Sequence, residues 1–219
     1  MSAGLVTGVA LLGALAGRAA VPLAHRFVDT AAPPGKPAGF SSDGPAERGT
    51  TALVGAVVFG GLAADRGADP ALPALLLVAA IGLALAVVDL ACLRLPDPLV
   101  GAAALAGGLG LAVTALVSGV PGRLLTALAG AAVSFAGYVL LALLPGARLG
   151  FGDVKLAAAL GLPLGWLGWP TLGLGLLLPH LLNGVTVLAL LAAGRVRRDT
   201  PLPLGPAMLT GAWLAILLA

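Results

Sequence analysis

The chain has few of the residues that soluble domains present to water or that metal sites use as ligands. Charged residues fill 10% of its 219 positions, whereas soluble domains carry roughly a quarter. Its single cysteine, Cys92, excludes an internal disulfide and a cysteine-rich zinc site. Its basic residues form no tract of the kind that binds nucleic acid. We therefore expect no nucleic-acid partner, no metal and no cofactor.

Hydrophobic residues dominate the remaining positions. They make up 59% of the chain, and the mean hydropathy is +1.08. The apolar runs are long and lack the two-residue alternation of barrel strands, so their backbone hydrogen bonds must be satisfied within helices. The sequence therefore predicts an all-α, polytopic integral membrane protein in the lipid bilayer, with residues 1–219 forming a single membrane-embedded domain.

Eight apolar segments are candidates for crossing the bilayer, for which a helix needs about 20 residues. The second and sixth are short, so the expected number of spanning helices is about eight, within a range of six to eight. The first segment is long for a secretory signal and no charged region precedes it, so we expect it to remain as a helix. The segments are 4–25, 51–64, 72–89, 98–118, 123–144, 154–169, 170–194 and 203–219.

The basic residues predict the orientation of these segments. Loops after odd-numbered segments hold nine of the twelve Lys and Arg residues, including those of the polar loop Arg26–Thr50, and the opposite loops hold only Arg66 and Arg123. Positive loops face the cytoplasm. The loop 26–50 is then a short cytoplasmic loop without a zinc motif. The same assignment places Asp89 and Asp153 at the cytoplasmic ends of their segments.

These two aspartates form the most informative pair in the sequence. Each lies at the edge of an apolar run, where a carboxylate is costly without a partner or a function. Two carboxylates held close together share one proton. The ionised member can then deprotonate a water while the protonated member donates to the carbonyl oxygen of a peptide bond. Asp89 and Asp153 are therefore the candidate catalytic residues.

Four further residues are candidates for supporting the pair or binding substrate. Gly150 and Gly152 allow positive φ angles and a close backbone approach in front of Asp153. The helix that starts there should favour ionised Asp153, and Lys155 should lower its pKa further or hold substrate. Asp97 precedes Pro98 and is predicted to cap a helix.

Two polar residues in the seventh segment share a helix face. His180 and Asn183 are three positions apart. Hydrogen bonding between helices is the favoured interpretation of both, and lining the site is the alternative.

Three motifs, in this order, resemble the type IV prepilin peptidases, which are membrane aspartyl proteases with a Gly-x-Gly-Asp motif. The first is Val87-Val88-Asp89-Leu90 followed by Leu93-Arg94-Leu95-Pro96-Asp97. The second is Gly150-Phe151-Gly152-Asp153-Val154-Lys155-Leu156. The third is Pro203-Leu204-Gly205-Pro206 at the start of the last segment.

The resemblance implies an aspartic-type endopeptidase in a prokaryotic plasma membrane, with its active site facing the cytoplasm. It would cut the leader peptides of type IV prepilins or pseudopilins, the subunits of pili and of type II secretion machinery. Asp89 and Asp153 would be its catalytic pair.

One feature departs from the large members of that family, which carry Cys-x-x-Cys zinc motifs in the first loop and also methylate the new N-terminus. The loop 26–50 has no cysteine, so we expect neither metal binding nor N-methyltransferase activity there.

Three alternative interpretations are considered. A presenilin-type protease shares Gly-x-Gly-Asp, but Pro73-Ala74-Leu75 precedes both aspartates here instead of following them. A proton-coupled transporter could also use paired carboxylates, although no internal repeat is evident. An inactive relative that serves in assembly is the third alternative.

Overall fold

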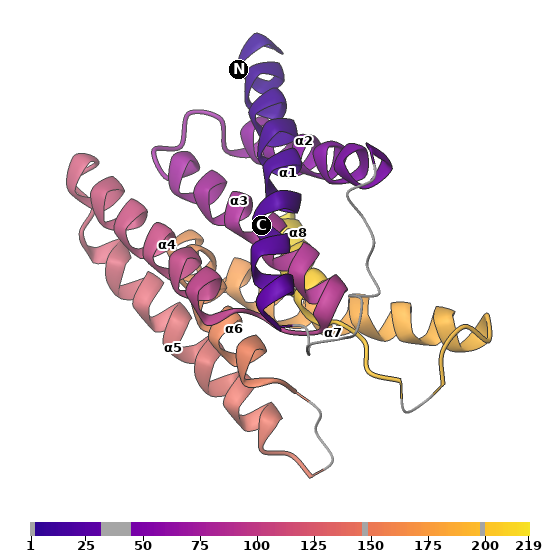
Figure 1. Cartoon of the computed structure of the whole chain (residues 1–219). Coiled ribbons are helices and arrows are strands. Elements are labelled where there is room, and N and C mark those ends of the chain that lie inside the picture. The colour runs from indigo at the N-terminus through magenta and orange to yellow at the C-terminus, as the bar shows by residue number, and fades with distance from the viewer. Residues whose placement is uncertain (1–2, 32–44, 146–148, 198–199) are drawn as a thin grey trace.

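The computed structural model describes residues 3–31, 45–145, 149–197 and 200–219, and these residues form eight α-helices joined by turns and short loops (Figure 1). The number of helices and their order agree with the eight predicted segments. The helices are α1 Ala3–Ala31, α2 Pro45–Arg66, α3 Leu72–Cys92, α4 Asp97–Val117, α5 Gly122–Ala142, α6 Phe151–Leu167, α7 Trp169–Ala192 and α8 Gly205–Leu218.

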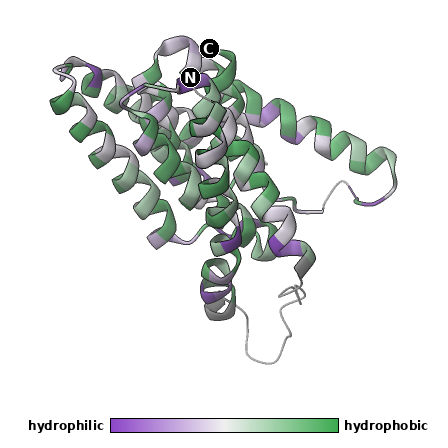
Figure 2. Cartoon of the chain, turned by 90° about the horizontal axis from the view of Figure 1, so that it is seen from above, coloured by the Kyte–Doolittle hydropathy of each residue, from purple (hydrophilic) through white to green (hydrophobic). Residues whose placement is uncertain are grey.

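Five of the described helices, α1, α3, α4, α5 and α7, are long and apolar enough to cross a membrane. This is fewer than the six to eight spanning segments predicted. With a rise of 1.5 Å per residue, α6 and α8 are about 25 and 21 Å long, short of the roughly 30 Å of hydrocarbon. Hydrophobic residues, coloured green in Figure 2, make up most of the helices. The chain is a multi-pass helical membrane protein.

The first two helices extend farther than the sequence predicted. Residues 26–31 and 45–50, assigned above to the loop, are helical, because helical hydrogen bonding continues past the apolar run where polar side chains can meet water. Glu47 lies in the first turn of α2, where a helix favours negative charge. The rest of the predicted loop, residues 32–44, lies outside the described residues.

Pro163 lies inside the sixth predicted segment, and α6 continues through it from Phe151 to Leu167. Proline removes one backbone donor and tends to kink a helix. Helices in membranes tolerate it because neighbouring groups can satisfy the freed carbonyl. The chain instead leaves the helical conformation five residues after Pro163, at Gly168, which has a φ of +126°.

Helix pairs approach each other closely along glycines. A Cβ on Gly13 or Gly17 in α1 would collide with the backbone of α2, and Gly55 faces α1 in the same way. A Cβ on Gly161 in α6 would lie 2.6 Å from both the carbonyl oxygen of Gly130 and the Oγ of Ser134 in α5. In a bilayer the hydrophobic effect does not drive helices together, so close packing of this kind stabilises helix pairs instead.

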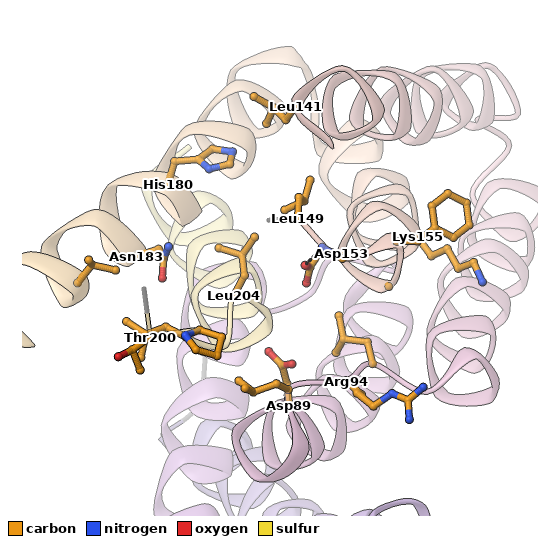
Figure 3. Close-up of a pocket in the computed structure, with 18 of the residues that line it drawn as sticks. Asp89, Arg94, Leu141, Leu149, Asp153, Lys155, His180, Asn183, Thr200 and Leu204 are labelled. Atoms are coloured by element: carbon orange, nitrogen blue, oxygen red, sulfur yellow. Dashed lines mark hydrogen bonds between the residues drawn. The ribbon is translucent and has the colours of Figure 1, made fainter. Parts of the chain in front are cut away.

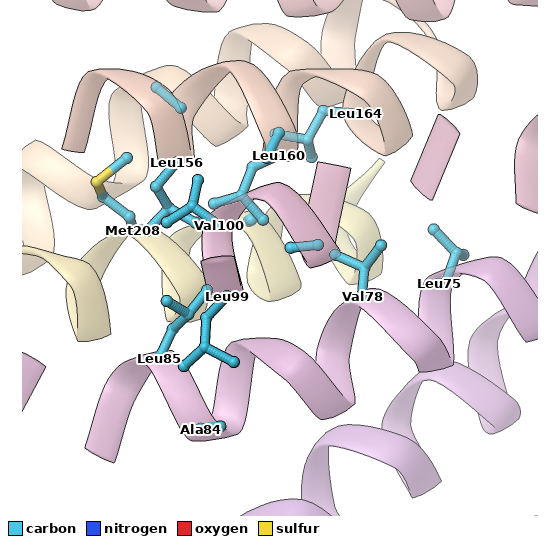
Figure 4. Packing of buried hydrophobic residues seen from close by; sticks show 14 of the residues in the cluster. Leu75, Val78, Ala84, Leu85, Leu99, Val100, Leu156, Leu160, Leu164 and Met208 are labelled. Carbon is cyan, nitrogen blue, oxygen red and sulfur yellow. The ribbon is translucent and has the colours of Figure 1, made fainter. Parts of the chain in front are cut away.

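The apolar core lies where α3, α4, α6 and α8 meet. Leu85, Val100, Leu160 and Met208 are among its buried members (Figure 4). The core includes Val88 and Val154, both fully buried, and each is the chain neighbour of a candidate catalytic aspartate. Packing at these valines fixes the ends of α3 and α6 that carry Asp89 and Asp153.

The α5–α6 contact yields a stability prediction. Gly161→Ala forces a methyl group against Gly130 and Ser134, and overpacking of this kind typically costs about 1–3 kcal/mol. Thermal unfolding of the purified chain in detergent should show a lower midpoint. Gly137→Ala is the matched control, because a Cβ on this α5 glycine meets no atom within 4 Å. A Gly161→Ala protein that melts at or above the wild-type temperature would contradict the packing described here.

Candidate active site

The C-terminal end of α3 and the N-terminal end of α6 open onto one pocket of about 1120 Å³. Asp89 on α3 and Asp153 on α6 both point into it (Figure 3). All six candidate site residues of the sequence line this pocket, since Asp97, Gly150, Gly152 and Lys155 also belong to its wall. The structure therefore brings together residues that lie up to 66 positions apart in the chain.

Asp89 is the more buried of the two carboxylates, with 4% of its surface exposed. Its Oδ2 accepts a hydrogen bond from the backbone N–H of Gly205 at 2.8 Å. A buried carboxylate requires such a partner, because burial removes the water that would otherwise solvate it. The N-terminus of α8 supplies that partner here.

Gly205 was quoted in the third motif but not predicted as a site residue. A Cβ on Gly205 would lie 2.8 Å from Oδ2 and 3.2 Å from Cγ of Asp89. Glycine is needed because any larger residue would occupy the position of the carboxylate. The sequence signal was the Gly-Pro pair that opens the last segment, but nothing in it identified Asp89 as the partner.

Asp153 is partly buried in the first turn of α6, outside the five candidate spans. Its Oδ2 accepts a hydrogen bond from the backbone N–H of Gly150 at 3.1 Å. Burial, and then the charge of Asp89, raise its pKa to about 6, although the Gly150 hydrogen bond acts in the opposite direction. The backbone N–H at the helix start favours ionised Asp153, as predicted, but desolvation and the neighbouring carboxylate outweigh it, so the net shift of the pKa is upward.

Lys155 makes its ion pair with Asp97 instead of Asp153. The Nζ of Lys155 lies 2.7 Å from Oδ1 of Asp97 and 5.0 Å from the centre of the Phe151 ring. The predicted capping role of Asp97 was also wrong, because Pro96 is the N-cap of α4, and Asp97 is its first residue and makes no capping hydrogen bond. The pair is largely solvent-exposed, so it links α4 to α6 at the pocket without stabilising the fold strongly.

The two glycines of the Gly-x-Gly-Asp motif have ordinary backbone conformations, and one of them allows a close helix contact. Neither has the positive φ that the sequence allowed for, since Gly150 has a φ of −73° and Gly152 is helical. A Cβ on Gly152 would lie 3.0 Å from the Cβ of Leu95. Gly152 therefore allows the start of α6 to pack against the loop between α3 and α4. This is a close backbone approach of the kind that the sequence predicted for the two glycines.

The turn after Asp89 contains an unusual backbone conformation. Leu93 follows α3 with a φ of +54°, and its N–H donates to the carbonyl oxygen of Asp89 at 2.9 Å. This left-handed position usually holds glycine, and strained backbone of this kind concentrates at functional sites. The turn directs Arg94, Leu95 and Asp97 along the wall of the pocket.

His180 and Asn183 on α7 line the same pocket, which supports the alternative that the sequence left open for them. The His180 ring lies 5.5 Å from the ring of Tyr138 on α5. Sequence reasoning missed Tyr138, because a lone tyrosine in an apolar run carries no signal of its neighbours. Among the described residues, no three His, Cys, Asp or Glu side chains gather closely enough to hold a metal ion.

The coupling between the two aspartates can be measured by titration. Asp89→Asn removes the negative charge that helps to raise the pKa of Asp153, so that pKa should fall below its value of about 6. Infrared spectra of the carboxyl groups across a pH series would follow it, with the Asp153 band identified by its loss in Asp153→Asn. Asp69→Asn, in the α2–α3 loop, is the control. An unchanged Asp153 titration in Asp89→Asn would show that the carboxylates do not interact.

Comparison with known proteins places these residues in a family. A family model described as the type IV leader peptidase family matches residues 76–196, which include both aspartates. Two relatives named prepilin leader peptidase/N-methyltransferase are each 34% identical. The protein from Aeromonas salmonicida strain A449 aligns over 66% of this chain and 48% of its own length. The protein from Burkholderia pseudomallei strain K96243 aligns over 72% and 50%.

The chain thus spans about half the length of the curated relatives it matches. No solved structure matched. More than half of the chain falls within the family model, and the chain belongs to the type IV leader peptidase family.

Proposed function

We propose that this protein is a membrane aspartyl endopeptidase that cleaves the leader peptides of type IV prepilins or pseudopilins. The observation that carries this proposal is the meeting of a buried and a partly buried aspartate in one pocket, at the ends of α3 and α6. Family membership supports the reaction class. The names of the relatives also include an N-methyltransferase activity, but our proposal is limited to cleavage.

The mechanism follows from one proton shared by the two carboxyl groups. The ionised aspartate takes a proton from a water, whose oxygen attacks the carbonyl carbon of the scissile peptide bond. The protonated aspartate donates to the carbonyl oxygen. When the tetrahedral intermediate collapses, a proton passes to the leaving amine and the carbon–nitrogen bond breaks. General acid and base catalysis of this type typically accelerates a reaction by 10²–10⁴-fold.

The charges of the described residues support a cytoplasmic active site. Arg94, Lys155 and Arg197 line the pocket. Arg66 lies at the opposite end, where its Nη2 donates to the carbonyl oxygen of Ile216 near the C-terminus of α8. Because basic residues concentrate on the cytoplasmic side of membrane proteins, the proposal places the pocket at the cytoplasmic face of the plasma membrane of a prokaryote.

Replacement of either aspartate tests the proposal. Asp89→Asn and Asp153→Asn should each lower leader cleavage by at least 10²-fold, because each removes one half of the acid–base pair. The assay uses the purified full chain and a prepilin in liposomes, with mass spectrometry of the new N-terminus. Asp69→Asn should cleave as wild type does. A mutant of either aspartate that cleaves normally would contradict its catalytic role, and a wild-type chain that moves protons but cuts nothing would favour a transporter.

Gly205→Ala tests how Asp89 is held in place. The new methyl group would displace the carboxylate and weaken its hydrogen bond to the α8 backbone, so we expect cleavage to fall at least tenfold while the chain remains folded. Gly184→Ala on α7 is the matched control, because a Cβ there meets no atom within 4 Å. Equal cleavage by the two variants, measured in the same assay at equal membrane levels, would show that the Gly205 contact is dispensable.

A further inference from the structure

A second, much smaller cavity lies among α5, α6, α7 and α8. Its wall is mainly apolar, but Ser134 and Tyr138 of α5 contribute hydroxyl groups to it. Tyr138 also contacts the ring of His180, which lines the pocket with the aspartates. The small cavity therefore lies one side chain away from the candidate active site.

Both hydroxyl groups are buried without a partner among the described residues. Ser134 is 1% exposed and Tyr138 is 2% exposed. Neither Oγ of Ser134 nor Oη of Tyr138 has a hydrogen-bond partner in the described part of the chain. Buried hydroxyl groups are nearly always hydrogen-bonded in native proteins, and ordered water is the usual partner where protein groups are absent.

One residue of the cavity wall has a backbone carbonyl that lacks its usual helical donor. Pro179 has no N–H, so the helix cannot supply its usual donor to the carbonyl of Gly175, four residues earlier. Gly175 and Pro179 both line the cavity. One donor is therefore missing beside two hydroxyl groups that also lack partners.

The size of the cavity decides what could fill it. The cavity has a volume of about 10 Å³. This is at the lower limit of the roughly 10–15 Å³ that a single water needs. We propose that this cavity binds one water molecule, hydrogen-bonded to the hydroxyl groups of Ser134 and Tyr138 and to the carbonyl of Gly175. Three partners lie within the range that buried waters normally have.

This water would link α5 to α7 beside the proline of α7. It accepts from the hydroxyl of Tyr138 and donates its two hydrogens to Oγ of Ser134 and the carbonyl oxygen of Gly175, so each of the three groups gains a hydrogen-bond partner. It would thereby hold Tyr138 in place against His180. The site does not depend on the proposed peptidase function, because it follows from burial, volume and hydrogen bonding alone.

Hydroxyl deletions separate a hydrated cavity from an empty one. If water is bound, Ser134→Ala and Tyr138→Phe each break a bridge and lower the thermal unfolding midpoint of the full chain in detergent. The unfolding midpoint of the double variant should then fall by less than the sum of the two single decreases, because both changes remove the same water. Thr114→Val is the positive control, since this buried hydroxyl already donates to Gly110 and Pro70 carbonyl oxygens.

An empty cavity predicts the opposite result. Deleting an unpaired buried hydroxyl removes a desolvation cost, so a midpoint that rises or stays unchanged in either single variant would overturn the proposal, as would additive losses. An experimental structure of the wild-type chain that resolves other buried waters gives a direct check. Density within hydrogen-bonding distance of both hydroxyl groups is expected, and an empty cavity would overturn the proposal even if a variant failed to fold.

Discussion

The buried carboxylate of Asp89 is the constraint on which the site depends. With 4% of the residue exposed, little water can solvate it, and its hydrogen bond comes from the backbone of Gly205. The N-terminus of a helix is a favourable partner for a carboxylate. That contact requires α8 to begin beside the end of α3 and requires glycine at its first position. The last helix is thus part of the site although it carries neither aspartate.

The second carboxylate is positioned by packing at the start of α6. The absence of a side chain at Gly152 allows this turn to pack against Leu95, and fully buried Val154 joins it to the core. Glycines along α5 and α6 hold the rest of the helix close to its neighbour. Because both aspartates stand on packed helices, their positions are fixed more precisely than loops would allow.

The sequence was sufficient to predict the helical membrane architecture and the location of both aspartates at the same end of it. An apolar run predicts a helix from its own residues, and the count of basic residues in the loops predicts the orientation, so neither requires a structure. The Gly205–Asp89 hydrogen bond spans 116 positions, and the pairing of Lys155 with Asp97 depends on how α4 meets α6. The direction of the pKa shift of Asp153 also required the structure, because burial raises this pKa while the hydrogen bond at the helix N-terminus lowers it.

The central claim is that Asp89 and Asp153 act together as a pair that shares one proton. The pH dependence of leader cleavage by the wild-type chain in liposomes tests it most directly. Activity should follow a bell-shaped curve, because both carboxyl groups are protonated at low pH and both are ionised at high pH. The pKa of about 6 for Asp153 places the decline above that pH. A rate that rises steadily with pH to a plateau would indicate a single base and contradict the paired mechanism.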